Sequence, residues 1–242
     1  QLDRRAGAPV SIEERDVSSV GALGVALAEA VAADLRSGIV RRSAASLAIS
    51  PRPTLLAFCV ALRAQPEVDW SRVQITLTDE CWVAPGSERS GEHFLRQHLV
   101  RDDVLDARLL GLWRRDRTPI EAAPEIAEFL SRMPRPLDAV VLEVGDEGEI
   151  AGLIPGIPGL DAMLNPNWSV PAAPSRVPDE AVERVTLTLR ALLDSHRVYL
   201  VVASAGAHRA YADALASGPA RSPVRALLAQ RRTPIVVLTV TG

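Results

Sequence analysis

The stretch Asp138-Ala139-Val140-Val141-Leu142-Glu143-Val144 decides the fold class of this chain of 242 residues. It is almost continuously apolar and does not alternate, which is typical of a central parallel strand that is buried on both faces. Val198–Val202 repeats the pattern further along the chain, and Leu47–Ile49 is a shorter apolar run. The sequence therefore predicts a mostly parallel sheet that contains these segments.

Helical patterns separate the strands. Apolar residues recur every three or four positions between Val20 and Leu35, which predicts an amphipathic helix. Further helices are expected at 55–63, 92–99, 120–133, 149–153, 206–216 and 223–230, further strands at 73–77, 108–113, 185–189 and 235–240, and long loops at 79–91 and 155–180. Because strands and helices alternate over the whole length, we expect a single α/β domain over residues 1–242, with residues 1–15 loosely ordered.

The composition excludes several classes of protein. The chain carries 27 basic and 30 acidic side chains, a net charge of −3, and 4% aromatic residues, so nucleic-acid binding has no support. No run of 18 apolar residues occurs, which predicts no membrane span. The two cysteines, Cys59 and Cys81, exclude a disulfide framework and a four-cysteine zinc site. Together with an N-terminus that lacks the apolar segment of a signal peptide, they predict a cytoplasmic protein.

Every basic side chain is an arginine, because the chain contains no lysine. This excludes a Schiff-base lysine, a P-loop lysine and a lysine general base. Arginine can still bind phosphate or carboxylate through its planar guanidinium. Abundant alanine favours the codon bias of a GC-rich genome as the origin of this composition. The four histidines show no metal-ligand spacing, and we expect neither a metal nor a cofactor.

The loops that follow the predicted strands are the expected place of a functional site. Ligands of parallel sheets bind beyond the carboxyl ends of the strands, which points to the loops at 50–54, 78–90 and 143–152. Asp79 and Glu80 stand directly after a strand in the second loop. This carboxylate pair either orients water and binds sugar hydroxyls, or belongs to a solvated turn in which the aspartate caps a helix.

Four segments in order along the chain carry a family resemblance. They are Leu47-Ala48-Ile49-Ser50-Pro51-Arg52-Pro53-Thr54, Thr78-Asp79-Glu80-Cys81-Trp82-Val83-Ala84-Pro85, Gly145-Asp146-Glu147-Gly148-Glu149 and Arg184-Val185-Thr186-Leu187-Thr188-Leu189. This order resembles the 6-phosphogluconolactonase family, within the larger glucosamine-6-phosphate isomerase-like group, over roughly residues 20–240. The resemblance implies a Rossmann-like sheet flanked by helices. It also implies hydrolysis of a 6-phosphorylated sugar lactone in the pentose phosphate pathway, with a sugar phosphate or sugar-like small molecule as the partner.

The resemblance also assigns roles to individual residues. Glu149 stands where the family carries a histidine that is taken as the general base, so it is the candidate catalytic residue. The candidate substrate-binding residues are Ser50, Arg52, Thr54, Asp79, Glu80, Gly145 and Arg184. The family counterpart of Arg184 contacts the substrate phosphate, although a strand-end arginine also fits a solvated surface. If this site is carried over, the Glu149 carboxylate and the Arg184 guanidinium should border one pocket.

The sequence departs from the family at positions that the chemistry needs. Pro51 and Arg52 replace two glycines of a phosphate loop, and a proline offers no backbone N–H donor. Arg52 either supplies charge through its side chain or is an exposed loop residue. Cys81 replaces the arginine of the family's G-D-E-R segment, and packing is favoured over a nucleophilic role. His208 and Arg209 are the candidates to replace a family lysine.

These departures leave two functions open, and with them the question whether the chain is an enzyme. Glu143, Asp146 and Glu147 crowd the turn that carries Glu149, and like charges oppose the binding of an anionic substrate. We therefore expect a family member that is impaired or inactive towards 6-phosphogluconolactone and that binds either a sugar-like ligand or a protein partner. The alternative is an active lactonase that uses Glu149 as its general base, since a carboxylate can act in that role.

Overall fold

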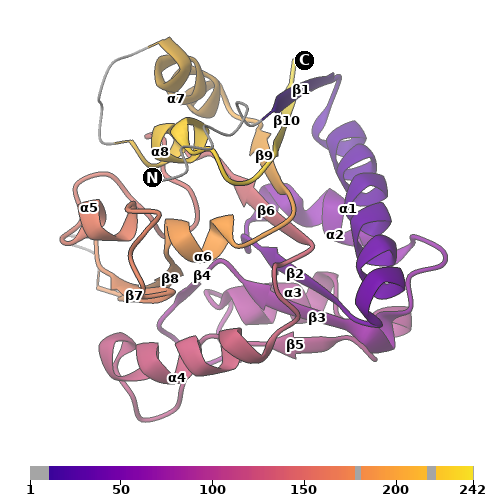
Figure 1. Ribbon diagram of the computed structural model, residues 1–242, viewed down its shortest axis with the longest axis horizontal. Coiled ribbons are helices and arrows are strands. Elements are labelled where there is room, and N and C mark those ends of the chain that lie inside the picture. Colours follow the sequence, from indigo (N-terminus) through magenta and orange to yellow (C-terminus); the bar gives the residue numbers. More distant parts are fainter. Residues whose placement is uncertain (1–10, 178–180, 217–221, 242) are drawn as a thin grey trace, which may run out of the picture.

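In the part of the chain that the structure describes, seven strands form a central sheet (Figure 1). The computed structural model describes residues 11–177, 181–216 and 222–241. The strand order is β1-β10-β9-β6-β2-β3-β5, and each neighbouring pair is parallel. Helices flank this sheet, so the expected single α/β domain with a mostly parallel sheet is confirmed.

The elements have the following bounds. The strands of the central sheet are β1 (Ile12–Val17), β2 (Ala45–Ile49), β3 (Val73–Leu77), β5 (Arg108–Leu110), β6 (Ala139–Glu143), β9 (Val198–Val202) and β10 (Ile235–Val240). A smaller antiparallel sheet consists, in spatial order, of β4 (Asp79–Cys81), β8 (Arg184–Leu187) and β7 (Ala172–Ser175). The helices are α1 (Val20–Arg42), α2 (Leu56–Arg63), α3 (Gly91–His98), α4 (Pro119–Arg132), α5 (Leu160–Met163), α6 (Leu189–Leu193), α7 (Ala205–Ala216) and α8 (Pro223–Ala229).

The inner strands β2, β6 and β9 are buried along almost their whole length, as their continuous apolar sequence predicts. Helices α1 and α2 pack against each other on one side of the sheet, while α6 and the smaller sheet lie on the other side (Figure 1). No helix in the described ranges is long and apolar enough to cross a bilayer. Because β9, β6, β2 and β3 are neighbours and run parallel, their carboxyl ends lie next to one another at one edge of the sheet.

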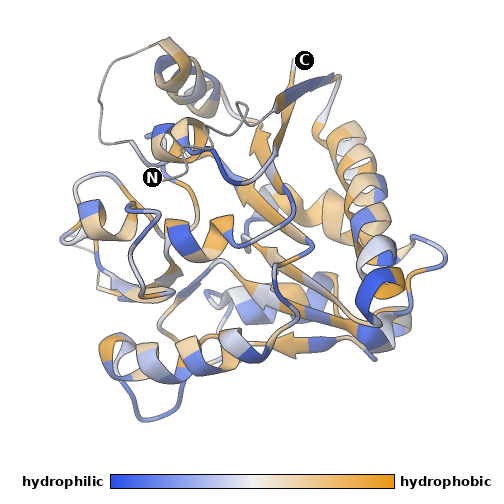
Figure 2. Cartoon of the chain, viewed as in Figure 1, coloured by the Kyte–Doolittle hydropathy of each residue, from blue (hydrophilic) through white to orange (hydrophobic). Residues whose placement is uncertain are grey.

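The edge strand β1 differs from the inner strands. Its sequence, Ile12-Glu13-Glu14-Arg15-Asp16-Val17, is charged and largely exposed, and Figure 2 shows it as hydrophilic beside the apolar inner strands. Charged side chains on an edge strand disfavour pairing with another chain. The expectation that residues 1–15 are loosely ordered is wrong for Ile12–Arg15, because these residues pair with β10. Residues 1–10 lie outside the described ranges.

The helix expected at 149–153 is wrong. Ile150 instead forms isolated bridges with Val144 and Leu153, so the segment folds back as a tight loop. Ala151 has a φ of 52°, in the left-handed region that interrupts a right-handed helix. This compact loop keeps Glu149 close to the end of β6.

Short elements also replace parts of the expected loops. Residues 79–91 contain β4, and residues 155–180 contain α5 and β7. Because β7 is four residues long and includes Pro174, no alternating or continuous apolar pattern marks it. The strand expected at 185–189 ends at Leu187, and α6 begins at Leu189. The smaller sheet therefore arises from pairing between distant short segments.

Candidate functional site

The loops that follow β2, β3 and β6 meet at one edge of the sheet. The hydroxyls of Ser50 and Thr78 lie 2.8 Å apart and join the first two loops. The backbone N–H of Thr78 donates to the Ile49 carbonyl at 3.0 Å, and that of Ser50 donates to the Val141 carbonyl at 2.9 Å. The structure thus brings together the three loops that the sequence indicates as the site.

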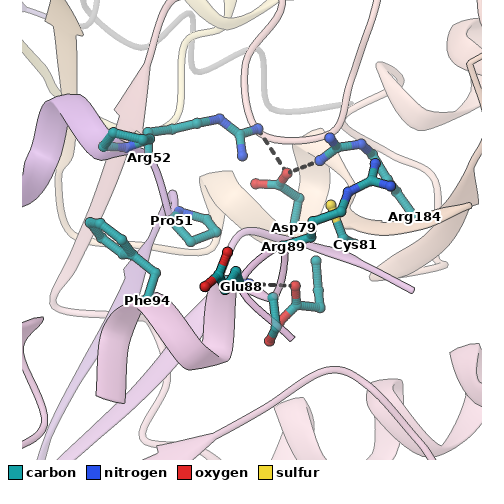
Figure 3. Close-up of a pocket in the computed structure, with 12 residues that line it drawn as sticks. Pro51, Arg52, Asp79, Cys81, Glu88, Arg89, Phe94 and Arg184 are labelled. Carbon is teal, nitrogen blue, oxygen red and sulfur yellow. Dashed lines mark hydrogen bonds and ion pairs between the residues drawn. The ribbon is translucent and has the colours of Figure 1, made fainter. Parts of the chain in front are cut away.

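Arg52 and Arg184 both contact the buried carboxylate of Asp79 (Figure 3). Nη2 of Arg52 donates to Asp79 Oδ2 at 2.8 Å and to the Ala151 carbonyl at 2.9 Å. Nη1 of Arg184 lies 3.5 Å from the same Oδ2, because the pairing of β4 with β8 aligns the two strands. The charge of Asp79 raises the pKa of Arg52. Arg52 is therefore an ion-paired residue, with 30% of its side chain exposed.

The carboxylate of Glu80 caps the beginning of α3. Its Oε1 accepts the N–H of Gly91 at 2.6 Å, and its Oε2 accepts the N–H of Glu92 at 2.8 Å and the hydroxyl of Ser90 at 3.2 Å. Burial raises the pKa of Glu80 to about 7, although these hydrogen bonds oppose the shift. The capping role considered for this carboxylate pair thus belongs to Glu80, whereas Asp79 is the partner of the two arginines.

Glu149 is folded against the turn that carries it. Its Oε2 accepts the N–H of Glu147 at 3.0 Å, and its backbone carbonyl accepts the N–H of Gly145 at 2.9 Å. A Cβ atom at position 145 would lie 1.8 Å from Oε1 of Glu149. Gly145 is therefore needed to make room for the Glu149 carboxylate in its present position.

A cavity of about 360 Å³ opens beside Glu149. We call it the acidic cavity, and its lining includes Glu143, Asp146, Glu149, Arg52, Thr54 and Ser204. Burial raises the pKa of Glu143, against the effects of a hydrogen bond from Thr54 and the charge of Arg52. The hydroxyl of Ser204 donates to Asp146. Three carboxylates thus face one arginine among the lining residues of this cavity.

A second cavity, of about 290 Å³, shares Arg52 with the acidic cavity, and Figure 3 shows the residues that line it. We call it the arginine cavity, and its lining includes Arg52, Arg89, Arg184, Cys81, Glu88 and Phe94. Burial raises the pKa of the Cys81 thiol, although the charge of Arg184 opposes the shift. A raised pKa disfavours the thiolate, the nucleophilic form, which supports a packing role for Cys81 over a nucleophilic one.

The expectation that Glu149 and Arg184 border one pocket is wrong. Glu149 lines the acidic cavity and Arg184 lines the arginine cavity, and the two cavities have Arg52 and Pro53 in common. The physical reason is the side chain of Arg52, which reaches across to Asp79 and Ala151 and so forms a wall between them.

The candidate replacements for the family lysine lie elsewhere. Arg209, on α7, lines a third cavity together with Glu147 and Arg225. His208 is half-buried and lines none of these three cavities.

Ser204 and Arg89 are among the lining residues that were not candidates from the sequence. Ser204 lies in the acidic cavity and Arg89 in the arginine cavity. A signal existed for both, since Ser204 follows the end of β9 and Arg89 belongs to the loop at 78–90. Because ligands of parallel sheets bind beyond the carboxyl ends of the strands, the end of β9 belongs to the same edge of the sheet as the three loops.

The two cavities differ in their balance of charged side chains. Three carboxylates face one arginine in the acidic cavity, whereas three arginines face three carboxylates, Asp79, Glu80 and Glu88, in the arginine cavity. Carboxylates accept hydrogen bonds from sugar hydroxyls, whereas guanidinium groups bind phosphate or carboxylate. Within the described ranges, no three His, Cys, Asp or Glu side chains are grouped so that they could hold a metal ion. The geometry is suited to a polar ligand with a hydroxylated part and an anionic part.

Known proteins resemble this chain over almost its whole length. The sequence profile described as "Glucosamine-6-phosphate isomerases/6-phosphogluconolactonase" matches residues 18–236. A 6-phosphogluconolactonase of Pseudomonas aeruginosa is 35% identical over 214 residues, which are 87% of this chain and 87% of that protein. One of Rhizobium meliloti is 33% identical over 217 residues, 89% of this chain and 93% of that protein. The crystal structure of a 6-phosphogluconolactonase from Shewanella baltica OS155 is similar with a TM-score of 0.90 and 31% identity, covering 97% of this chain and 100% of that one. The chain therefore belongs to the glucosamine-6-phosphate isomerase/6-phosphogluconolactonase family.

Proposed function

We propose that this chain is a family member that keeps a binding site for a sugar phosphate but is impaired or inactive in the hydrolysis of 6-phosphogluconolactone. The observation that carries the proposal is the position of Glu149, which replaces the histidine taken as the family's general base. Its Oε2 is occupied by the N–H of Glu147, and its Oε1 lies against Gly145. The Glu149 carboxylate thus packs against the backbone of the loop that carries it.

The chemistry of a carboxylate base supports the same conclusion. General-base catalysis is most efficient when the pKa of the base lies near the operating pH. A carboxylate is intrinsically a weaker base than imidazole, so it removes a proton from water less readily at neutral pH. Glu143 and Asp146 line the same cavity and repel a phosphorylated substrate.

The loop after β2 has lost the backbone donors that cradle a phosphate. Pro51 and Pro53 carry no N–H, and the N–H of Arg52 donates to the Ser50 carbonyl at 2.9 Å. Three consecutive residues therefore offer no unoccupied backbone N–H to a ligand. This supports a loss of the family's phosphate loop rather than a small adjustment of it.

The alternative is an active lactonase of the pentose phosphate pathway with Glu149 as its general base. Its support is that Glu149 lines a cavity at the carboxyl ends of the strands, and that relatives named 6-phosphogluconolactonase match most of the chain. A cytoplasmic location is part of either proposal, and the free thiols of Cys59 and Cys81 support a reducing compartment.

Hydrolysis of 6-phosphogluconolactone above its spontaneous rate decides between the two functions. The purified wild type, Glu149→Gln and Glu149→His should be compared, with the Pseudomonas aeruginosa relative assayed under the same conditions. We expect little or no acceleration by the wild type and none by Glu149→Gln. Acceleration by the wild type that Glu149→Gln abolishes would establish the alternative. Acceleration close to that of the relative, whether or not Glu149→Gln changes it, would overturn the proposal.

A further inference from the structure

Arg89 is the least engaged cation of the arginine cavity. Its side chain lies on the same side of the cavity as Cys81 and Arg184 (Figure 3). Arg89 is exposed, and its guanidinium makes no hydrogen bond or ion pair with another residue of the described ranges. An exposed guanidinium at the rim of a cavity can approach an incoming anion without first breaking an ion pair.

Other donors around this cavity are already bound to the chain's own carboxylates. Arg52 donates to Asp79 and to the Ala151 carbonyl. The N–H groups at the beginning of α3, on Gly91 and Glu92, donate to Glu80. A ligand would have to displace the buried Glu80 carboxylate to use the N–H groups of α3, which costs desolvation and lost hydrogen bonds. The charge of Arg52 is already balanced by Asp79.

The position of Arg89 also relates to a substitution in the same loop. Cys81 stands where the resemblance places an arginine, so the cavity lacks the guanidinium that would extend from that position. Arg89, eight residues later, brings a guanidinium to the same cavity, and its charge acts on the Cys81 thiol. The segment 78–90 thus lacks the family arginine at position 81, but it carries Arg89, whose guanidinium lines the same cavity.

We propose that Arg89 binds the phosphate of a phosphorylated sugar or polyol in the arginine cavity and takes the place of the arginine that Cys81 replaces. Arginine suits this role because its planar guanidinium donates two parallel hydrogen bonds to phosphate oxygens. The hydroxylated part of the ligand extends past Arg52 towards the acidic cavity, which has Arg52 and Pro53 in common with the arginine cavity. The inference rests on the sugar-phosphate-binding part of the proposed function.

Isothermal titration calorimetry with stable ligands tests the inference. The probes are inorganic phosphate, 6-phosphogluconate and gluconate, the last of which lacks only the phosphate. We expect Arg89→Ala to weaken the binding of 6-phosphogluconate about tenfold or more, since a charge-assisted hydrogen-bonded pair is lost. Binding of gluconate should change little. The matched control is Arg132→Ala, which removes an exposed arginine of α4 that lies in neither cavity.

A rescue variant separates a ligand contact from a structural role. Restoring the family arginine in Cys81→Arg/Arg89→Ala should recover most of the lost affinity, and Glu88→Gln should strengthen phosphate binding because a carboxylate of the cavity lining is neutralised. Unchanged affinity in Arg89→Ala, no recovery in the double variant, or no binding of 6-phosphogluconate by the wild type would each overturn the inference.

The two proposals fail separately. Rapid lactone hydrolysis by the wild type would overturn the proposed loss of activity and leave the role of Arg89 standing. Conversely, a wild type without hydrolysis and an Arg89→Ala variant with unchanged affinity would overturn only the role of Arg89.

Discussion

At the scale of single residues, carboxylates of the chain itself occupy the groups around the site that would otherwise bind an anion. Asp79 contacts two arginines, and Glu80 caps α3. Asp146 accepts the hydroxyl of Ser204, and Glu149 accepts the N–H of Glu147. Each contact is local, yet together they lower the capacity of this edge of the sheet to bind a negatively charged ligand.

Glu80 should make the stability of the fold depend on pH. Its pKa rises from 4.5 to about 7 on folding, so the folded state binds the proton more tightly than the unfolded state. Protonated Glu80 therefore stabilises the fold at low pH, and this contribution is lost as the pH rises through about 7. By linkage, the free energy of unfolding should fall by about 3 kcal/mol in total between a pH below the unfolded pKa of 4.5 and a pH above about 7. Urea unfolding of wild type and Glu80→Gln between pH 5 and 8 measures this.

In Glu80→Gln the part of the decrease that comes from Glu80 should be absent, because no proton is exchanged at position 80, whereas the part that comes from other buried carboxylates such as Glu143 should remain. The variant should also be less stable at pH 5, since the amide nitrogen cannot accept an N–H from the beginning of α3. Glu121→Gln is the control, because the hydrogen bonds from Thr118 lower the pKa of Glu121 and move its titration below this range. Equal pH dependence in wild type and Glu80→Gln would contradict the prediction.

At the scale of elements, the close packing of α1 on α2 depends on one glycine. A Cβ atom at Gly24 would lie 2.7 Å from the backbone carbon of Ala57 and 2.8 Å from the backbone nitrogen of Phe58. Because backbone atoms cannot turn aside as a side-chain end can, the two helices would have to separate. At Gly21, three residues earlier in the same helix, the nearest atom is the Ser19 hydroxyl oxygen at 3.8 Å.

These two glycines provide a matched pair of variants. Gly24→Ala should destabilise the protein by about 1–3 kcal/mol through overpacking, although alanine favours a helix by up to about 1 kcal/mol. Gly21→Ala should be neutral or stabilising, because a Cβ atom in this first turn of α1 meets no clash. Thermal and urea unfolding of both variants measure the difference. If Gly24→Ala were as stable as Gly21→Ala, close backbone contact would not be what requires glycine at position 24.

The elements also differ in how far the sequence predicts them. The buried strands β2, β6 and β9 and the helix α1 are long or strongly patterned, and the residues alone indicate them. The strands β4 and β7 are three and four residues long, and their sequences carry no pattern of their own. They exist because β8 pairs with both, and such pairing between distant segments leaves no local periodicity to recognise.

At the scale of the whole molecule, Asp138 joins the first helix to the middle of the sheet. This carboxylate is fully buried at the start of β6. It accepts the N–H of Ser46 at 2.8 Å and a hydrogen bond from Arg41 at 3.1 Å, and it pairs with Arg42. The end of α1, the start of β2 and the start of β6 therefore meet at one side chain, opposite to the end of the sheet that carries the site.

Asp138→Ala should destabilise the whole domain by about 2–4 kcal/mol, because it removes a buried charged acceptor, leaves the buried N–H of Ser46 unsatisfied and leaves two partly exposed arginines unpaired. Urea unfolding, followed by fluorescence and by circular dichroism, should give coincident transitions whose midpoints lie at a lower urea concentration than in the wild type. Asp69→Ala is the control, since its pair with Arg72 is about half exposed and should contribute less than about 1 kcal/mol. Equal stability of the two variants would show that Asp138 does not hold these elements together.

The sequence by itself determined the α/β class, the inner strands and the loops that carry the site, because burial on both faces and strand-end positions leave local patterns. It also indicated the replaced residues at positions 51, 52, 81 and 149. Only the tertiary structure decided how those residues are arranged. Arg52 divides the site into two cavities because Asp79 and Ala151 hold its guanidinium, and Glu149 turns into its own loop because Gly145 leaves room. Such contacts join segments far apart in the chain, and no local spacing of residues encodes them.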